Sequence, residues 1–279
     1  MVQRLSITVL ADNSAGPGGL LAEHGLSFPI EADGSRVLFD TGQGLVLRHN
    51  VAALGLSLDP LDAVVLSHGH YDHTGGLAGV LEDARPGAIY VHPAALENKF
   101  ARRGPDSFRS VGIPASSREA LEGWKDRIVR TSTAAEVAPG VWCTGEIPRA
   151  RTEGEAEQFF FLDEEGRTPD PLADDQALFI DTARGLVILS GCAHAGVVNT
   201  VDHACRLAGR QDIHALIGGL HLGSATHKQL EETGNALGRR RFQYLAPCHC
   251  TGMNAHAYLR ARFHSVVRDV NAGSRLVLE

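Results

Sequence analysis

Four short apolar segments of this chain are each followed within a few residues by a histidine, and this recurrence restricts the fold more than any other feature. The segments are typical of buried strands, and the histidines that follow them are His68, His194, His221 and His249. Between these segments lie stretches whose apolar residues recur at helical spacing. Alternation of strands and helices indicates α/β layering, where ligands bind at the carboxyl ends of the strands. The sequence therefore predicts a site at which these histidines meet.

The hydrophobic pattern predicts secondary structure on both sides of a less regular central region. Strands are expected at 5–10, 35–39, 63–66, 88–92, 177–180, 186–189, 215–217 and 244–246. Helices are expected at about 45–54, from 74–77 onward, and at about 198–208 and 227–237. A chain of 279 residues can bury one substantial core, so we expect a single domain over 1–279.

The central region, 93–170, departs from this alternation. Its stretch 99–117 carries Arg, Gly, Pro and Ser without a sustained period. Long irregular segments in compact domains are often lids or binding loops. We expect an insertion or a lid here, with a surface insertion of no function as the alternative.

Composition limits the classes of partner. The formal net charge of −7 argues against a broad nucleic-acid-binding face, which needs clustered Lys and Arg. The five cysteines are odd in number and scattered, which favours a reducing compartment over a disulfide framework. No apolar run reaches the length that crosses a bilayer. We expect a cytoplasmic protein that acts on a small molecule, without nucleic-acid or membrane partners, and the oligomeric state stays open.

The run from His68 to His73 carries the strongest chemical signal. It places three imidazoles and the Asp72 carboxylate within six residues, and these groups suit Zn²⁺ and neighbouring transition metals. Residues 68 and 70 lie on one side of an extended segment and can hold one ion, while Asp72 and His73 can reach a second. We therefore expect two divalent ions, with zinc as the first choice and manganese or iron as alternatives.

The pattern His68-X-His70-X-Asp72-His73 resembles the signature of the metallo-β-lactamase superfamily. That resemblance implies an α/β (α+β) fold, a four-layer αββα sandwich of the metallo-β-lactamase type.

Further segments extend the resemblance. Asp40-Thr41-Gly42 resembles the family's first conserved turn, whose aspartate orients metal ligands, and Pro247-Cys248-His249 resembles its last metal-ligand position. The runs at 174–176, 191–196, 219–222 and 249–252 resemble one branch, commonly labelled as related to dihydropterin ribofuranosyl-aminobenzene phosphate synthase.

The second half departs from the family pattern. The family's third histidine falls on Asp175 and its bridging aspartate on Cys192, while His194 offers another ligand. We expect Asp175 and His194 to face the metals. Cys192 either bridges them or lines the pocket as a small buried residue. Which of these three residues complete the two metal shells stays open.

The remaining histidines and cysteines give weaker signals. His221 is expected as a ligand, as a proton donor to the substrate, or as a core histidine. Cys248 and Cys250 are expected as small buried side chains. No motif surrounds His24, His49, His203, His214, His256 or His264, and no role is assigned to them.

The expected reaction is hydrolysis. Two metals would hold a bridging hydroxide, and Asp72 would orient it and carry a proton to the leaving group. An ester, lactone, thioester or phosphodiester of a small molecule fits this chemistry, with an anionic or phosphorylated compound among the expectations. A pterin- or phosphoribosyl-related synthase or transferase is the alternative. A di-iron redox protein is disfavoured because His70 stands where the redox branch commonly has glutamate.

Overall fold

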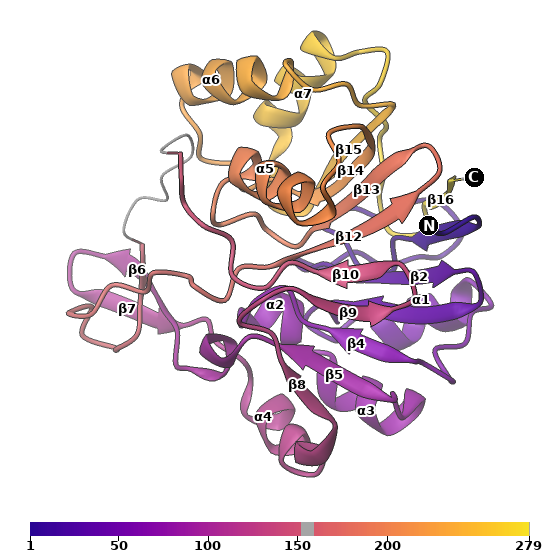
Figure 1. Ribbon diagram of the computed structural model, residues 1–279. Coiled ribbons are helices and arrows are strands. Elements are labelled where there is room, and N and C mark those ends of the chain that lie inside the picture. Colours follow the sequence, from indigo (N-terminus) through magenta and orange to yellow (C-terminus); the bar gives the residue numbers. More distant parts are fainter. Residues whose placement is uncertain (152–158, 279) are drawn as a thin grey trace.

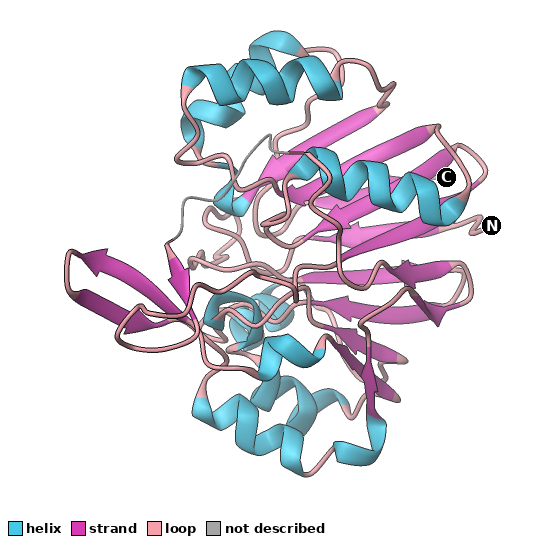
Figure 2. Ribbon diagram, turned by 60° about the vertical axis from the view of Figure 1, so that its left-hand side comes forward, coloured by secondary structure: helices cyan, strands magenta, loops and turns pink. Residues whose placement is uncertain are grey.

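The computed structural model describes residues 1–151 and 159–278 as two large β-sheets that face each other, with helices on both outer faces (Figures 1 and 2). A small third sheet stands beside them. The four main layers confirm the predicted αββα sandwich.

The first large sheet has the strand order β16-β1-β2-β3-β4-β5-β8. Its strands are β1 (Leu5–Thr8), β2 (Phe28–Ala32), β3 (Ser35–Phe39), β4 (Ala63–Val65), β5 (Ala88–Val91), β8 (Ile128–Arg130) and β16 (Arg275–Leu278). The strands from β3 to β8 run parallel, whereas β16, β1, β2 and β3 pair antiparallel.

The second large sheet has the order β15-β14-β13-β12-β10-β9. Its strands are β9 (Ala135–Ala138), β10 (Val141–Cys143), β12 (Ala177–Thr182), β13 (Gly185–Ser190), β14 (Ile213–Gly219) and β15 (Tyr244–Cys248). The third sheet contains β6 (Phe100–Gly104), β7 (Ser107–Ser110) and β11 (Phe160–Phe161). Because β13, β14 and β15 run parallel, the turns that follow them lie at one edge of the sheet.

The helices cover the outer faces. The α-helices are α1 (Leu47–Ala53), α2 (Tyr71–Thr74), α3 (Leu77–Ala84), α4 (Ala115–Glu122), α5 (Val197–Ala208), α6 (His227–Leu237) and α7 (Met253–Arg262). Short 3₁₀ turns occur at η1 (Pro93–Leu96), η2 (Lys125–Arg127) and η3 (His249–Thr251). Within the described residues, no helix has the length and apolar character needed to cross a membrane.

Alternation along the strands explains the three main cores. On β3, Val37 and Phe39 enter the core between the sheets, while Leu38 enters the core beneath the helices of the first sheet. On β13, Leu189 faces the central core and Ile188 packs toward α5. Strands buried on both faces read as continuous apolar runs, which is why their positions could be predicted.

The central region differs in part from the expectation for 93–170. β8, β9 and β10 belong to the two large sheets, so much of this region is integral to the sandwich. Only β6, β7 and β11 form the separate sheet, and 99–117, expected to be irregular, contains the β6–β7 hairpin. Part of the expected insertion, 152–158, lies outside the described residues. A lid role and the extent of the domain stay predictions.

Candidate metal centre

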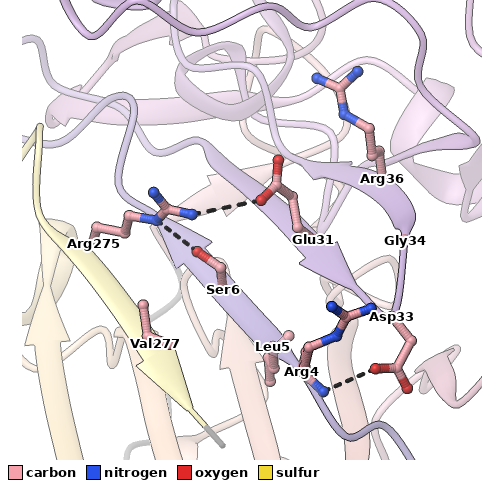
Figure 3. A pocket seen from close by; sticks show the side chains of 9 residues that line it. All are labelled: Arg4, Leu5, Ser6, Glu31, Asp33, Gly34, Arg36, Arg275 and Val277. Carbon is pink, nitrogen blue, oxygen red and sulfur yellow. Dashed lines mark hydrogen bonds and ion pairs between the residues drawn. The ribbon is translucent and has the colours of Figure 1, made fainter.

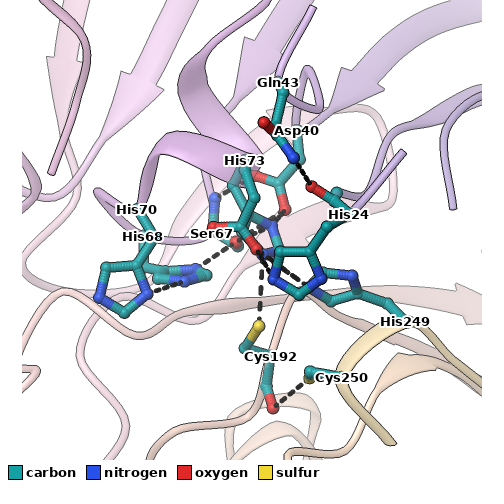
Figure 4. Close-up of polar contacts among 12 residues, drawn as sticks. His24, Asp40, Gln43, Ser67, His68, His70, His73, Cys192, His249 and Cys250 are labelled. Carbon is teal, nitrogen blue, oxygen red and sulfur yellow. Dashed lines mark hydrogen bonds and ion pairs between the residues drawn. The ribbon is translucent and has the colours of Figure 1, made fainter. Parts of the chain in front are cut away.

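The turns that follow β4, β13, β14 and β15 converge at one edge of the sandwich. Figure 4 shows side chains from three of these turns gathered around a common centre. Three residues in these turns have a left-handed backbone conformation: Ala193 (φ 57°), His221 (φ 51°) and His249 (φ 51°). This conformation is costly for non-glycine residues and is concentrated at functional sites. The turns also approach closely, since a Cβ at Gly191 would lie 2.1 Å from the Ser67 Oγ. The sequence-predicted strand-end histidines are thus brought together.

A first cluster of ligand atoms is centred on His68. Its Nε2 lies 2.9 Å from His70 Nδ1 and 3.2 Å from His194 Nε2. Ligand atoms of His68, His194 and Cys192 all lie within 4.8 Å of one another, and all three side chains are buried. Two nitrogens on one tetrahedral zinc ion are separated by about 3.3 Å, given Zn–N bonds of about 2.05 Å. The spacing therefore fits a shared cation.

A second cluster lies beside the first. His73 Nε2 is 3.2 Å from His249 Nε2, and Asp72 Oδ2 is 3.4 Å from His249 Nε2 and 3.6 Å from His73 Nε2. Cys192 Sγ is 3.2 Å from His73 Nε2. Cys192 therefore belongs to both clusters, so its thiol lies between two candidate ion positions.

The chemistry of the donor set supports the same fit, and the ring nitrogens of His70 and His194 that point away from His68 are left without a partner among the described residues. These atoms, His70 Nε2 and His194 Nδ1, are buried. Buried polar atoms normally have a partner, and such an exception needs an explanation. Imidazole, thiolate and carboxylate groups directed at one another form a donor set that suits zinc and related transition metals.

Asp40 orients ligands of both clusters. Its Oδ2 lies 2.7 Å from His73 Nδ1 and accepts a 2.7 Å hydrogen bond from Ser67 Oγ, which is also 2.8 Å from His68 Nδ1. Its Oδ1 accepts a 2.7 Å hydrogen bond from the Ser67 backbone N–H. A carboxylate behind a ligating histidine fixes its ring orientation and tautomer. The sequence resemblance expects Asp40 to orient metal ligands, and that role stays a prediction.

The adjacent carboxylates Asp174 and Asp175 serve different turns. Asp175 Oδ2 accepts a 2.7 Å hydrogen bond from the Ala195 N–H, and the clusters of ligand atoms do not include it. Asp174 Oδ2 accepts a 2.7 Å hydrogen bond from the Gly69 N–H, between the first two histidines of the motif. Burial raises the pKa of Asp175 to about 6. Asp175 thus lies behind the His194 turn, while Asp174 fixes the motif loop.

His221 and Cys250 form a third group next to Cys192. The ring of His221 lies 4.2 Å from that of His194, and its backbone N–H is 3.3 Å from Cys250 Sγ. Ligand atoms of Cys192, His221 and Cys250 lie within 4.8 Å of one another. Burial acts to lower the pKa of His221, but Cys250 raises it overall. Cys250 is therefore closer to the centre than its expected role as a small buried side chain implies.

The structure adds residues to which the sequence analysis gives no role. His24 Nε2 lies 3.2 Å from Asp72 Oδ2, although its side chain is 53% exposed. Asn13 Oδ1 lies 2.8 Å from His249 Nδ1, and Asp12 Oδ1 accepts a 2.8 Å hydrogen bond from the His249 N–H. These residues come from loops after β1, where no motif marks them. Their closeness to the site depends on contacts between segments that lie far apart in the sequence.

The two clusters differ in charge. Burial lowers the pKa of His70 to about 3 and holds the pKa of His68 and His194 well below the usual range, so these imidazoles are neutral. Burial also opposes charge on His73, but Asp40 and Asp72 outweigh it and raise the pKa of His73 to about 9. The three imidazoles of the first cluster can therefore bind a cation without losing a proton. Burial raises the pKa of the Cys192 thiol, so a cation held by Cys192 displaces the thiol proton, and a cation at the second cluster also displaces the proton of His73.

A separate pocket lies away from these clusters. It has a volume of about 420 Å³ and is lined by residues of β1, β2, β16 and nearby turns, including Arg4, Glu31 and Arg275 (Figure 3). Arg275 contacts Ser6 Oγ at 2.8 Å and Glu31 at 3.7 Å, so its charge is partly paired within the pocket. No candidate metal ligand lines it, and the donor chemistry therefore locates the centre at the strand ends.

Comparisons with known proteins agree with this geometry. A family model described as the metallo-beta-lactamase superfamily matches residues 22–197. The 7,8-dihydropterin-6-methyl-4-(beta-D-ribofuranosyl)-aminobenzene-5'-phosphate synthase of Methanocaldococcus jannaschii is 30% identical over 98% of this chain and 96% of that protein.

Solved structures show the same fold. A metal-dependent hydrolase of the beta-lactamase superfamily superposes with a TM-score of 0.79 at 28% identity, covering 99% of each chain. Zn²⁺-bound PqqB from Methylobacterium extorquens has a TM-score of 0.56 at 15% identity, covering 98% of this chain and 100% of that one. The matched length and the shared sandwich establish that this chain belongs to the metallo-beta-lactamase superfamily.

Proposed function

We propose that this chain is a metallohydrolase with a two-metal centre, which cleaves an ester, lactone, thioester or phosphodiester of a small molecule. The observation that carries the proposal is the position of Cys192 Sγ, which belongs to both clusters of buried ligand atoms. Two adjacent clusters with a common anionic ligand suit a pair of divalent ions. Zinc fits this donor set best, with manganese and iron as alternatives.

The proposed ligands divide between the two positions. His68, His70 and His194 hold one ion, and Asp72, His73 and His249 hold the other, with Cys192 between them. Asp175, which the sequence resemblance suggests as a ligand, is proposed instead to position the turn that carries His194, because its carboxylate accepts the Ala195 N–H. A two-ion centre supplies a water nucleophile at neutral pH and polarises the bond under attack.

The surrounding side chains can move the proton of the attacking water. Burial acts to raise the pKa of the Asp72 carboxyl, but His73, His24 and His249 outweigh burial. They hold this pKa well below the usual range, so Asp72 is ionised. A proton that Asp72 takes up from the water can pass to His24. The His24 Nε2 lies 3.2 Å from Asp72 Oδ2, and its ring reaches solvent. His221, beside His194, is the proposed proton donor to the leaving group.

A synthase or transferase on the same centre is the second candidate. The M. jannaschii relative, a synthase, favours it, because that protein aligns with nearly the whole chain. The two candidates differ in one measurable respect. A hydrolase converts a single organic substrate with water, whereas the synthase needs a second organic substrate before product appears.

The test combines metal analysis with a substrate screen on the zinc-reconstituted chain. We expect close to two zinc ions per chain and turnover of at least one ester, lactone, thioester or phosphodiester. His70→Ala should abolish that turnover, while His203→Ala, which changes a buried histidine outside the clusters, should retain it. Two bound ions without turnover of any substrate class would refute the hydrolase. Failure to bind zinc, manganese or iron would refute both candidates.

A further inference from the structure

The three-stranded sheet carries a row of side chains that faces the metal centre. Phe160 on β11 pairs with Ala101 on β6, and Ala101 pairs with Arg109 on β7. Residues directly opposite on neighbouring strands project from the same face of a sheet. The ring of Phe160 lies 4.7 Å from the ring of His70 and 5.5 Å from that of His194. The face that holds Arg109 is therefore the face directed toward the candidate ligands.

The opposite face of this sheet is occupied by its own contacts. Arg102 lies over the rings of Phe108 and Phe161, at 5.6 Å and 4.9 Å from their centroids. The rings of Phe108 and Phe161 also contact each other edge to face, at 5.2 Å. This packing holds Arg102 on the face away from the metal centre. Arg102 is thus a natural control for Arg109.

Arg109 is fixed beside the metal-binding motif. Its guanidinium lies 5.5 Å from the ring centroid of Tyr71, the residue that directly follows His70. The Tyr71 N–H donates a 2.9 Å hydrogen bond to the Val111 carbonyl, which ties the end of the hairpin to the motif. Stacking on an aromatic ring orients a guanidinium without using its hydrogen-bond donors. Arg109 can therefore present those donors to a ligand.

The charge of Arg109 is unpaired within the described part of the chain. None of the ion pairs of residues 1–151 and 159–278 includes it, and it is exposed. A guanidinium matches the geometry of carboxylate and phosphate groups. Since neighbouring strands lie about 4.8 Å apart, Arg109 and Phe160 are separated by roughly 10 Å across the small Ala101. From the metal centre outward, the row therefore offers an aromatic ring at Phe160, a gap over the small Ala101 and a guanidinium at Arg109 that can bind an anion.

We propose that this row recognises the substrate: a flat or aromatic group packs on Phe160 next to the reacting bond, and Arg109 binds an anionic group at the far end. The anion is a carboxylate or a phosphate. This proposal rests on the proposed catalytic centre, and it adds the substrate class, an aromatic compound with a remote anion. Phe160 and Arg109 act in binding and orientation.

Non-hydrolysable probes test the proposal by binding alone. Phenylphosphonate offers one anion to the metals, while 4-phosphonobenzoate and 1,4-phenylenediphosphonate add a second anion across the ring. Dissociation constants are measured by titration calorimetry with the zinc-loaded full chain and its variants. We expect the two probes with a second anion to bind about tenfold more tightly than phenylphosphonate, as for a charge-assisted hydrogen bond. The larger gain of the two identifies the preferred anion.

The variants separate recognition from a general effect of charge. Arg109→Ala should remove the advantage of the second anion and leave phenylphosphonate binding within about twofold, while Arg109→Lys should retain part of it. Arg102→Ala should retain all of it. The proposal is overturned if the unaltered chain shows no advantage, if Arg109→Ala keeps it, or if Arg102→Ala loses it equally. Because binding is measured without turnover, a failed hydrolase assay leaves this comparison intact.

Discussion

At the scale of single residues, Cys192 is the side chain that the two clusters of candidate ligand atoms share. The superfamily resemblance places a bridging aspartate at this position, and both thiolate and carboxylate ligate zinc. Its Sγ lies 3.2 Å from His73 Nε2 and also belongs to the cluster of His68 and His194. A common ligand of this kind couples the binding of one ion to that of the other.

Replacement of Cys192 tests this coupling. Cys192→Ala should reduce bound zinc from about two ions to about one and lower turnover at least about 100-fold, because an anionic ligand is lost. Cys192→Asp should restore two ions, since a carboxylate can bridge. Cys205→Ser, a change at a buried cysteine in α5, should alter neither quantity. Full zinc content in Cys192→Ala, measured by elemental analysis, would exclude the shared-ligand role.

His73 makes the stability of the metal-free protein depend on pH. Its pKa rises from 6.5 to about 9 in the folded protein, because Asp40 and Asp72 outweigh the effect of burial. A raised folded-state pKa adds stability that is complete below pH 6.5 and is lost as the pH rises toward 9. The free energy of unfolding, measured by urea titration of zinc-free protein, should therefore fall by up to about 3 kcal/mol across this range.

The variant His73→Gln isolates this contribution. It should flatten the decline between pH 6.5 and 9, whereas His203→Gln should leave the decline unchanged. Equal slopes in the unaltered chain and in His73→Gln would show that His73 is not protonated in the metal-free fold.

At the scale of elements, a buried lysine joins the start of the β6–β7 hairpin to the metal-binding motif. Lys99 is only 1% exposed, and its Nζ lies 2.8 Å from Asp170 Oδ2 and 3.0 Å from Asp174 Oδ1. Asp174 Oδ2 in turn accepts a hydrogen bond from the Gly69 N–H. This chain of contacts links the small sheet, the segment before β12 and the motif loop.

Removal of the lysine charge should leave two buried carboxylates without their cation. Lys99→Met should lower the free energy of unfolding by about 3–5 kcal/mol, because it leaves the carboxylate charges buried without a cation. Lys125→Met, which breaks an exposed pair with Glu122, should cost less than about 1 kcal/mol. Adding Asp170→Asn and Asp174→Asn to Lys99→Met should recover much of the loss. Similar effects of the two single variants in urea unfolding would contradict the buried linkage.

The elements that could be predicted are those whose own residues carry a pattern. β3 and α6 fall where the sequence predicts them, because β3 ends in the apolar run Val37–Phe39 and α6 has helical spacing with a capping residue, Thr226. β2 and β16 were not predicted: β2 contains Pro29 and Glu31, and β16 is an exposed edge strand. α7 buries only Ala255 and Leu259, which gives too little periodic signal.

The site shows the same division. The motif from His68 to His73 is local in sequence, and the strand-end positions of His194 and His249 follow from the α/β rhythm. His24 and Asn13 reach the centre through long-range pairing, which no local pattern records. Asp174 and Asp175 are neighbours in sequence, yet their carboxylates serve different turns, and spacing alone does not assign them.

At the scale of the whole molecule, the proposed centre joins the two halves of the sandwich. The motif and Asp40 follow strands of the first large sheet, whereas Cys192, His194, His221 and His249 follow strands of the second. Bound ions would therefore act as cross-links between the sheets. Binding to the folded state alone stabilises it by mass action.

Zinc should raise the thermal stability of the chain. At free zinc about 100 times its dissociation constant, each bound ion adds roughly 2.7 kcal/mol to the free energy of unfolding. The midpoint of thermal unfolding should rise on zinc addition and fall with a chelator. In the double variant that combines His68→Ala and Cys192→Ala, most of the zinc-dependent rise in the unfolding midpoint should disappear. An unaltered rise in that variant would place the stabilising zinc elsewhere.

Anomalous X-ray diffraction at the zinc edge of zinc-loaded crystals would show directly whether two ions lie on either side of Cys192. We expect two peaks about 3.5–4 Å apart, each about 2.3 Å from Cys192 Sγ, with His68 and His194 on one ion and His73 and His249 on the other. A single peak, or two peaks both more than about 6 Å from Cys192 Sγ and therefore beyond ligand reach, would contradict this expectation.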